Sequence, residues 1–168
     1  MELKDALTNI DITFEEIQTI AKSAAKSYTK ELDDIFESVK NVKDLTDSQL
    51  KNLIVLISLK TYSFSEVEEV AELKGEIAES LRKEAYTKAL LSAEGTAGVK
   101  DAQATSASQN EKVAELISTT IAAILKNKRD EAHRFVAALQ AVLFARTQEA
   151  KISALNTSEK AAYEQSTF

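Results

Sequence analysis

Few side chains in this 168-residue chain could carry out catalysis. The chain has no cysteine and a single histidine, His133, which lies in a charged segment beside Asp130 and Glu131. A Ser–His–Asp triad could therefore be built only around His133, and its charged neighbours are typical of a helix surface in water. We expect His133 to be a surface residue and the protein not to be an enzyme.

Metal and cofactor motifs are also missing. Acidic pairs with helical spacing occur, such as Glu72 and Glu76, but a di-metal helical bundle needs a Glu-x-x-His on each of two helices. One histidine cannot supply both. The three glycines, at positions 75, 95 and 98, match neither a phosphate-binding loop nor a dinucleotide-binding fingerprint. The sequence therefore predicts no metal, no cofactor and no small-molecule substrate.

Two basic clusters are the remaining candidates for binding chemistry. They comprise Lys126, Lys128, Arg129 and Arg134 in one segment and Arg82, Lys83 and Lys88 in an earlier one. If the two segments pair as an antiparallel hairpin centred near residue 102, Arg82 and Lys83 lie opposite positions 122 to 123. That is one turn from Lys126, so the clusters could merge into one phosphate-binding patch. Ordinary helix faces in water are the alternative interpretation.

Composition indicates which elements must position these clusters. The chain is 44% apolar and 29% charged, with three glycines and no proline, as is typical of long helices and coiled coils. No apolar run reaches the roughly 18 residues of a membrane span, and no secretory signal pattern opens the chain. We expect one helical domain in the cytoplasm, without membrane contact.

The net charge of −6 is distributed unevenly. Residues 1–73 contain 8 Lys and no Arg against 15 Asp and Glu, which gives −7. Residues 74–108 are neutral, with 5 charges of each sign, and residues 109–168 carry 8 basic against 7 acidic groups, which gives +1. An anion-binding surface should therefore lie in the later segments, and the acidic first part could itself meet a basic partner.

The segment 110–155 dominates the pattern. It contains no glycine, proline or turn cluster, so it predicts one helix of about 45 residues, roughly 68 Å long at 1.5 Å per residue. We expect an oligomer, because a single chain of this size would leave part of such a rod exposed. The apolar stripe that other chains would cover is Ile117, Ile121, Ile124, Leu125, Phe135, Leu139, Val142 and Leu143.

Three capping boxes predict the earlier helices. Thr13 with Glu16 opens a helix to about residue 41, whose apolar series is Phe14, Ile17, Ala21, Ala24, Tyr28, Ile35, Val39 and Val42. Thr46 with Gln49 opens a second helix. Ser65 with Glu68 opens a third, which ends near Glu94–Gly95. Gly75 within the third helix is typical of close packing.

The segments between and beyond these helices are polar. Residues 96–109 (TAGVKDAQATSASQ) are small and weakly apolar, which predicts a poorly ordered loop or hinge, or a helix that forms only on binding. Residues 1–9 suggest a short helix or loose leader, and residues 156–168 a fraying polar tail. The expected domain is 1–155, with acidic helices over 1–64 and a helical hairpin over 65–155.

The order of these elements resembles the phage recombination mediators of the UvsY type. The resemblance covers about residues 67–152: a helix with the pair Leu73–Lys74, a polar loop, and a long closing helix that ends in RTQEAKI. It implies a ring-like oligomer, single-stranded DNA contact that includes Lys74, a recombinase partner and the host cytoplasm. The family continues with Ala and Arg where this chain has Gly75 and Glu76, so Arg82 and Lys83 would have to take over.

Together these patterns predict an all-α protein, a long antiparallel hairpin with a shorter N-terminal helical pair. The first functional hypothesis is a non-enzymatic mediator that binds single-stranded DNA and helps to load a recombinase. The second is a phage structural or assembly protein that contacts only other protein chains. The third is an acidic inhibitor or adaptor whose N-terminal part imitates nucleic acid.

Overall fold

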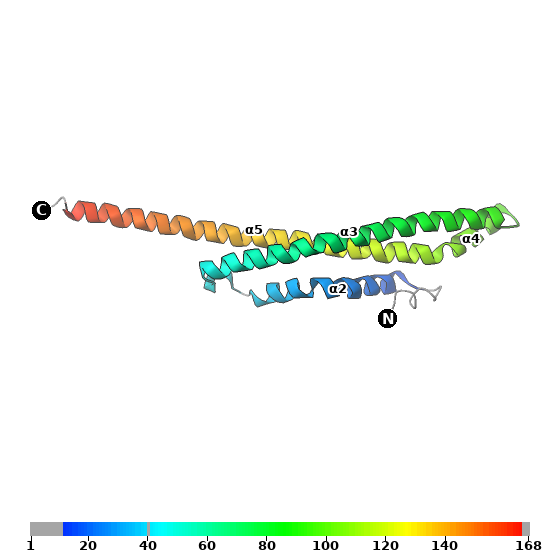
Figure 1. Ribbon diagram of the computed structural model, residues 1–168, viewed down its shortest axis with the longest axis horizontal. Coiled ribbons are helices and arrows are strands. Elements are labelled where there is room, and N and C mark those ends of the chain that lie inside the picture. Colours follow the sequence, from blue (N-terminus) through cyan, green and yellow to red (C-terminus); the bar gives the residue numbers. More distant parts are fainter. Residues whose placement is uncertain (1–11, 40, 166–168) are drawn as a thin grey trace.

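A computed structural model describes residues 12–39 and 41–165, with side chains up to residue 157. This part of the chain is all-α and elongated, and it contains four α-helices and one 3-10 turn (Figure 1). They are α2 (Phe14–Ser38), η1 (Val42–Asp44), α3 (Asp47–Ser92), α4 (Ala97–Ala107) and α5 (Gln109–Gln165). The short helix or leader expected over residues 1–9 lies outside the described residues.

Three helices form the bundle, with α3 antiparallel to α5 and α2 lying along both (Figure 1). Near its start α2 packs Ile17 against Val113 and Ile117 of α5. Near its end Leu32 joins a second core cluster with α3 and α5. Because the two ends of α2 meet successive parts of α5 in the same order, α2 runs parallel to α5. The second cluster consists of Leu32, Leu50, Ile57, Phe64, Ala132 and Leu139.

Helix α2 begins at the predicted capping box. The Thr13 backbone N–H donates to Glu16 Oε2 at 2.7 Å, and the Glu16 N–H donates to Thr13 Oγ1 at 3.3 Å. The Thr13 N–H, together with the Thr13 hydroxyl, which donates to the same Glu16 oxygen at 3.1 Å, lowers the pKa of the exposed Glu16 carboxyl. Within the predicted apolar series Ile17 is buried, whereas Phe14 and Tyr28 are exposed. Phe14 and Tyr28 thus share the apolar spacing of the helix but are not covered by the described part of the chain.

Helix α3 is a single element of 46 residues, which corrects the predicted helical pair. Its start at the Thr46 capping box is confirmed. The Ser65–Glu68 pattern, however, lies in the helix interior. The nearby hydroxyls bond to carbonyls of their own helix: Thr61 Oγ1 donates to the Ile57 carbonyl and Ser63 Oγ to the Lys60 carbonyl, both at 2.7 Å. These groups need no helix end, and the predicted boundary between residues 64 and 65 does not exist.

The predicted loop over residues 96–109 is also wrong, because residues 97–107 form α4. This segment is rich in alanine, the strongest helix former, and that propensity outweighs its low apolar content. The hydroxyl of Tyr86 donates to Asp101 Oδ1 at 2.6 Å and fastens α4 to α3. The chain turns between α3 and α4 at Gly95, whose φ of 109° suits a residue without a Cβ.

Helix α5 is uninterrupted over 57 residues, about 86 Å, which confirms the predicted rod and extends it. The polar tail does not fray within the described part, because the helix continues to Gln165. The C-terminal part of α5 extends beyond the start of α3 (Figure 1). None of the described helices has a stretch sufficiently long and apolar to act as a membrane span.

The apolar stripe predicted for oligomerisation lies mostly within this chain's own core. Ile117, Leu125 and Leu139 are buried, and α2 and α3 supply the surrounding side chains. Ile121, Phe135, Val142 and Leu143 are partly buried against the same two clusters, and Ile124 is half-buried. Another chain is therefore not required to cover this stripe, contrary to the expectation.

Candidate interaction surfaces

The register of the α3–α5 hairpin differs from the one predicted. Arg82 Nε donates to Glu115 Oε2 at 2.7 Å, so Arg82 lies opposite residue 115 rather than residues 122 to 123. A Cβ added at Gly75 would lie 3.1 Å from Thr119 Cγ2, which places a close approach of the two helices there and agrees with the packing role predicted for this glycine. The shift amounts to about two helical turns. It arises because the chain turns near Gly95 and not at residue 102.

This register places Lys126 among acidic side chains. A groove of about 520 Å³ lies between α3 and α5, and Lys126 is one of its lining residues. The carboxylates of Glu72, Glu76, Glu79 and Glu115 also line it, together with Gly75, Thr119, Ala122 and Ala123. The place where the two basic clusters were predicted to meet is therefore an acidic groove, and the prediction of one joined cationic patch is wrong.

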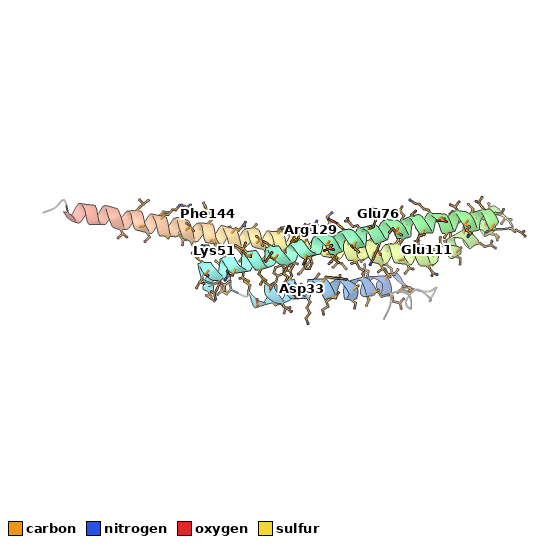
Figure 2. All side chains as sticks on the ribbon, in the orientation of Figure 1. Asp33, Lys51, Glu76, Glu111, Arg129 and Phe144 are labelled. Carbon is orange, nitrogen blue, oxygen red and sulfur yellow. The ribbon has the colours of Figure 1, made fainter. Side chains whose placement is uncertain are left out.

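Arg129 extends into the bundle. Its Nη1 lies 2.6 Å from Glu68 Oε2, and the Glu68 side chain is only 6% exposed. That oxygen has the ion pair but no hydrogen bond of good geometry. Figure 2 labels Arg129 where α3 and α5 cross in this view. A guanidinium held in this way neutralises a buried carboxylate, so it is not available to a phosphate.

Lys128 fastens α2 to α5. Its Nζ lies 2.5 Å from Asp33 Oδ1 on α2 and 2.8 Å from Glu131 Oε2 on its own helix. It also lies 4.7 Å from the centre of the Phe36 ring, within the range of a cation–π contact. Burial lowers the pKa of Lys128, but the hydrogen bonds to Asp33 and Glu131 outweigh burial and raise it above 10.5.

The other predicted cations lie on the surface. Lys83 Nζ pairs with Glu79 Oε1 at 2.6 Å, and this hydrogen bond lowers the pKa of the Glu79 carboxyl. Arg134 donates from Nε to the Asp130 carbonyl at 3.3 Å. Four of the eight predicted cations form no ion pair with any described residue: Lys74, Lys88, Lys126 and Arg134. The eight residues thus do not form one surface.

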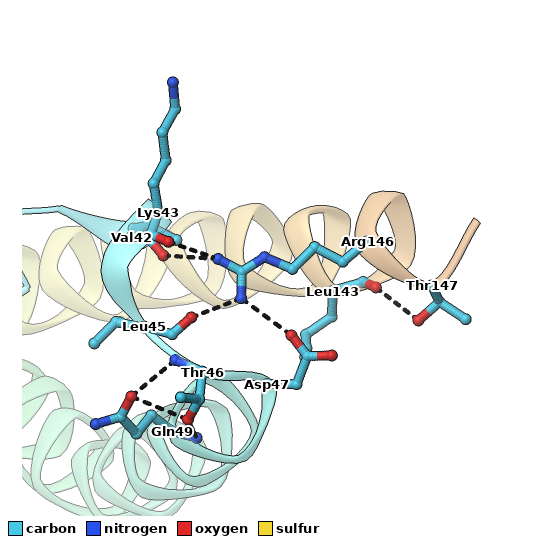
Figure 3. A network of polar contacts seen from close by, with 9 residues as sticks. All are labelled: Val42, Lys43, Leu45, Thr46, Asp47, Gln49, Leu143, Arg146 and Thr147. Carbon is cyan, nitrogen blue, oxygen red and sulfur yellow. Dashed lines mark hydrogen bonds and ion pairs between the residues drawn. The ribbon is translucent and has the colours of Figure 1, made fainter. Parts of the chain in front are cut away.

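Arg146 forms a polar contact network that sequence reasoning missed (Figure 3). Its Nη1 donates to the Leu45 carbonyl at 2.6 Å and to Asp47 Oδ1 at 3.0 Å, and its Nη2 donates to the Lys43 carbonyl at 3.0 Å. The available signal was the seven-residue repeat on α5, which runs Leu125, Ala132, Leu139 and then Arg146. At the fourth position an arginine follows three apolar residues, because it meets backbone carbonyls at the α2–α3 corner.

Helix α3 also has an apolar face that the described part of the chain does not cover. Leu50, Ile57, Phe64, Ala71 and Ala78 repeat every seven residues and are buried, and they form what we call the inner face. On the opposite side lies what we call the outer face, whose seven members are all at least 45% exposed. The outer face consists of Val55, Leu59, Tyr62, Val70, Leu73, Ile77 and Leu81.

Groups suited to catalysis or metal binding are few in the part of the chain that the structure describes. His133 is exposed, as predicted. No group of three or more His, Asp or Glu side chains in the described ranges is arranged to hold a metal ion. Comparisons of the chain with protein-family models, with curated proteins and with solved structures find no match.

Proposed function

We propose that this protein is a non-catalytic assembly protein, which acts by packing its long helices against other protein chains, copies of itself included. The observation that carries the proposal is the outer face of α3, a row of seven exposed apolar side chains on a well-formed helix. Monomeric proteins rarely expose contiguous apolar patches of several hundred Å², and such patches usually mark protein contacts.

Electrostatics supports a protein partner in preference to a nucleic acid. Phosphate binding depends on cations that can displace the counterions of the nucleic acid. Arg82, Lys128 and Arg129 instead neutralise carboxylates of their own chain. The groove beside Lys126 is lined by four glutamates, which would repel a phosphate backbone.

Single-stranded DNA binding as a recombination mediator is the second candidate. The observation that favours it is the set of cations without ion pairs among the described residues, of which Lys88 and Lys126 are exposed on the two arms of the hairpin. A mediator would use these residues for phosphate contact and would have a recombinase as its protein partner.

One titration separates the two candidates. The mass of the full chain is measured by light scattering from about 1 to 100 μM, and a labelled oligonucleotide is titrated at 50 and 200 mM salt. The assembly proposal expects the mass to rise above that of one chain and the oligonucleotide to remain free. A mass of one chain throughout the range contradicts it.

A set of charge variants sharpens the DNA measurement. The mediator candidate expects binding at 50 mM salt that falls steeply at 200 mM. It also expects Lys88→Ala with Lys126→Ala to abolish that binding. Lys112→Ala with Lys151→Ala is the matched control, since it removes the same charge from exposed positions of α5 outside the two clusters. Equal loss in both pairs would indicate general electrostatic attraction and contradict a defined DNA site.

A further inference from the structure

The outer face has the geometry of a second helix-packing seam. Successive residues of an α-helix are rotated by about 100°, so the seven outer-face residues fall within an arc of about 100°. The middle of that arc lies nearly opposite Ile57 and Phe64 of the inner face, which point to the bundle core. Helix α3 therefore has one apolar seam that packs on α5 and a second apolar seam with no covering helix in the described part of the chain.

We propose that the outer face binds a second copy of this chain, with the two α3 helices antiparallel and centred near Ile77. This inference rests on the proposed assembly function and names its partner and its surface. A second copy satisfies both sides of such a contact with one sequence, since an isologous dimer pairs each residue i with j and each j with i.

Charge along α3 favours a second copy and fixes its direction. Before Ile77, the exposed charges of residues 66–76 are four glutamates, at 66, 69, 72 and 76, against Lys74. After Ile77, Arg82 and Lys83 pair with Glu115 and Glu79 of their own chain, so Lys88 is the cation available to a partner, beside the exposed Glu84. An antiparallel copy centred at Ile77 places Glu66 of each helix beside Lys88 of the other, whereas a parallel copy in register places Glu66 beside Glu66.

Residue pairing follows from the centre at Ile77. Ile77 meets Ile77 of the second copy, and Leu73 meets Leu81 of the second copy. Glu66 lies within the arc of the seam, and in this register it meets Lys88 of the second copy, twice by symmetry. Glu66, the acidic residue between Tyr62 and Val70 on the outer face, would thus receive an opposite charge.

In this register the exposed area is that of a small, exchanging dimer interface. The five outer-face residues that this register places against the second α3, Tyr62, Val70, Leu73, Ile77 and Leu81, expose on the order of 500 Å² per chain, less than the 800 Å² or so that each partner contributes to a standard interface. Most of this exposed area is apolar, because each of these side chains is aliphatic or aromatic. A contact of this size would be a dimer in exchange with monomers at micromolar concentration.

The first test removes the face. Leu73→Asp with Ile77→Asp should weaken the dimer about 100-fold or more, measured by sedimentation equilibrium, while circular dichroism shows unchanged helix content. Phe144→Asp is the control, since Phe144 is a similarly exposed apolar residue on α5, away from the outer face. A wild-type oligomer that persists in the double variant overturns the proposed surface but leaves the assembly function standing, whereas a monomeric wild type contradicts both.

The second test determines whether the two α3 helices of the dimer are antiparallel. The chain has no cysteine, so single introduced thiols report their own contacts under mild oxidation. Ile77→Cys should cross-link to itself. Glu66→Cys and Lys88→Cys should each remain monomeric in denaturing gels, but a mixture of the two should give a cross-linked dimer. Self-cross-linking of Glu66→Cys without a mixed product would overturn the antiparallel arrangement.

Discussion

The inner and outer faces of α3 have similar apolar spacing but different surroundings. On the inner face Ile57 and Phe64 are almost fully buried against α2 and α5. On the outer face Leu59, two residues after Ile57, is 65% exposed, and Tyr62, two residues before Phe64, is 82% exposed. The comparison teaches that a helical stripe shows where a helix can pack but does not identify the partner that covers it.

The largest difference between the faces should appear on truncation of an aromatic residue. Phe64→Ala creates a cavity in the core and should lower the free energy of unfolding by about 3–5 kcal/mol. Tyr62→Ala removes an exposed ring and should change it by less than about 0.5 kcal/mol in dilute monomer. Urea unfolding at sub-micromolar concentration, followed by circular dichroism, measures both. Similar losses in the two variants would contradict the assignment of the faces.

The buried ion pair provides the next largest effect. Arg129→Met leaves the buried Glu68 carboxylate of α3 without its partner, and the free energy of unfolding should fall by about 3 kcal/mol. Adding Glu68→Leu removes the unpaired charge and should restore most of the lost free energy of unfolding. The same urea experiment tests both variants, and a double variant no more stable than Arg129→Met alone would show that the charge is not the cause.

Substitution of Gly75 tests how closely α3 approaches α5 at this position. Gly75→Ala gains about 1 kcal/mol of helix propensity, but the new Cβ would lie 3.1 Å from Thr119 Cγ2. We expect the single variant to be close to neutral. In a Thr119→Ser background, which lacks that methyl group, Gly75→Ala should raise the free energy of unfolding by about 1 kcal/mol. Equal effects in both backgrounds would mean that Thr119 does not limit the approach.

The smallest effect concerns the ion pair between Glu79, which lines the groove between the two helices, and the exposed Lys83. Lys83→Gln should let the pKa of Glu79 return upward toward its ordinary value of 4.5, because the hydrogen bond from Lys83 is lost. A lowered folded-state pKa stabilises the protein above pH 4.5, and that contribution is lost as the pH falls through the folded value. An NMR titration of the Glu79 side chain, with Lys51→Gln as control, measures the change.

Local signals allowed much of the fold to be predicted. The Thr13 and Thr46 capping boxes mark real helix starts, because the threonine and its partner three residues later satisfy end groups of the backbone. The unbroken helix over residues 110–155 followed from the absence of glycine and proline. The Ser65–Glu68 pattern misled, because hydroxyls within a helix can bond to carbonyls of the preceding turn.

The surfaces were harder to predict, because they depend on register. Arg82 was expected near residue 122 on the assumption of a central loop, and a helical α4 moved it to Glu115. Once the register changes, each basic residue has new neighbours, and Lys126 lies among glutamates instead of cations. The buried ion pair could be predicted in part. An acidic residue within an apolar stripe, such as Glu68, needs a buried cationic partner, but the sequence does not show that this partner is Arg129.

The Arg146 network has a consequence for the folding kinetics. It joins residues 42–47 to a side chain about 100 positions later, so it can form only after the hairpin has closed and α5 has reached the α2–α3 corner. Such a contact should be absent from the folding transition state. Arg146→Met is therefore expected to leave the refolding rate unchanged and to accelerate unfolding, so that this one guanidinium governs how long the native state persists.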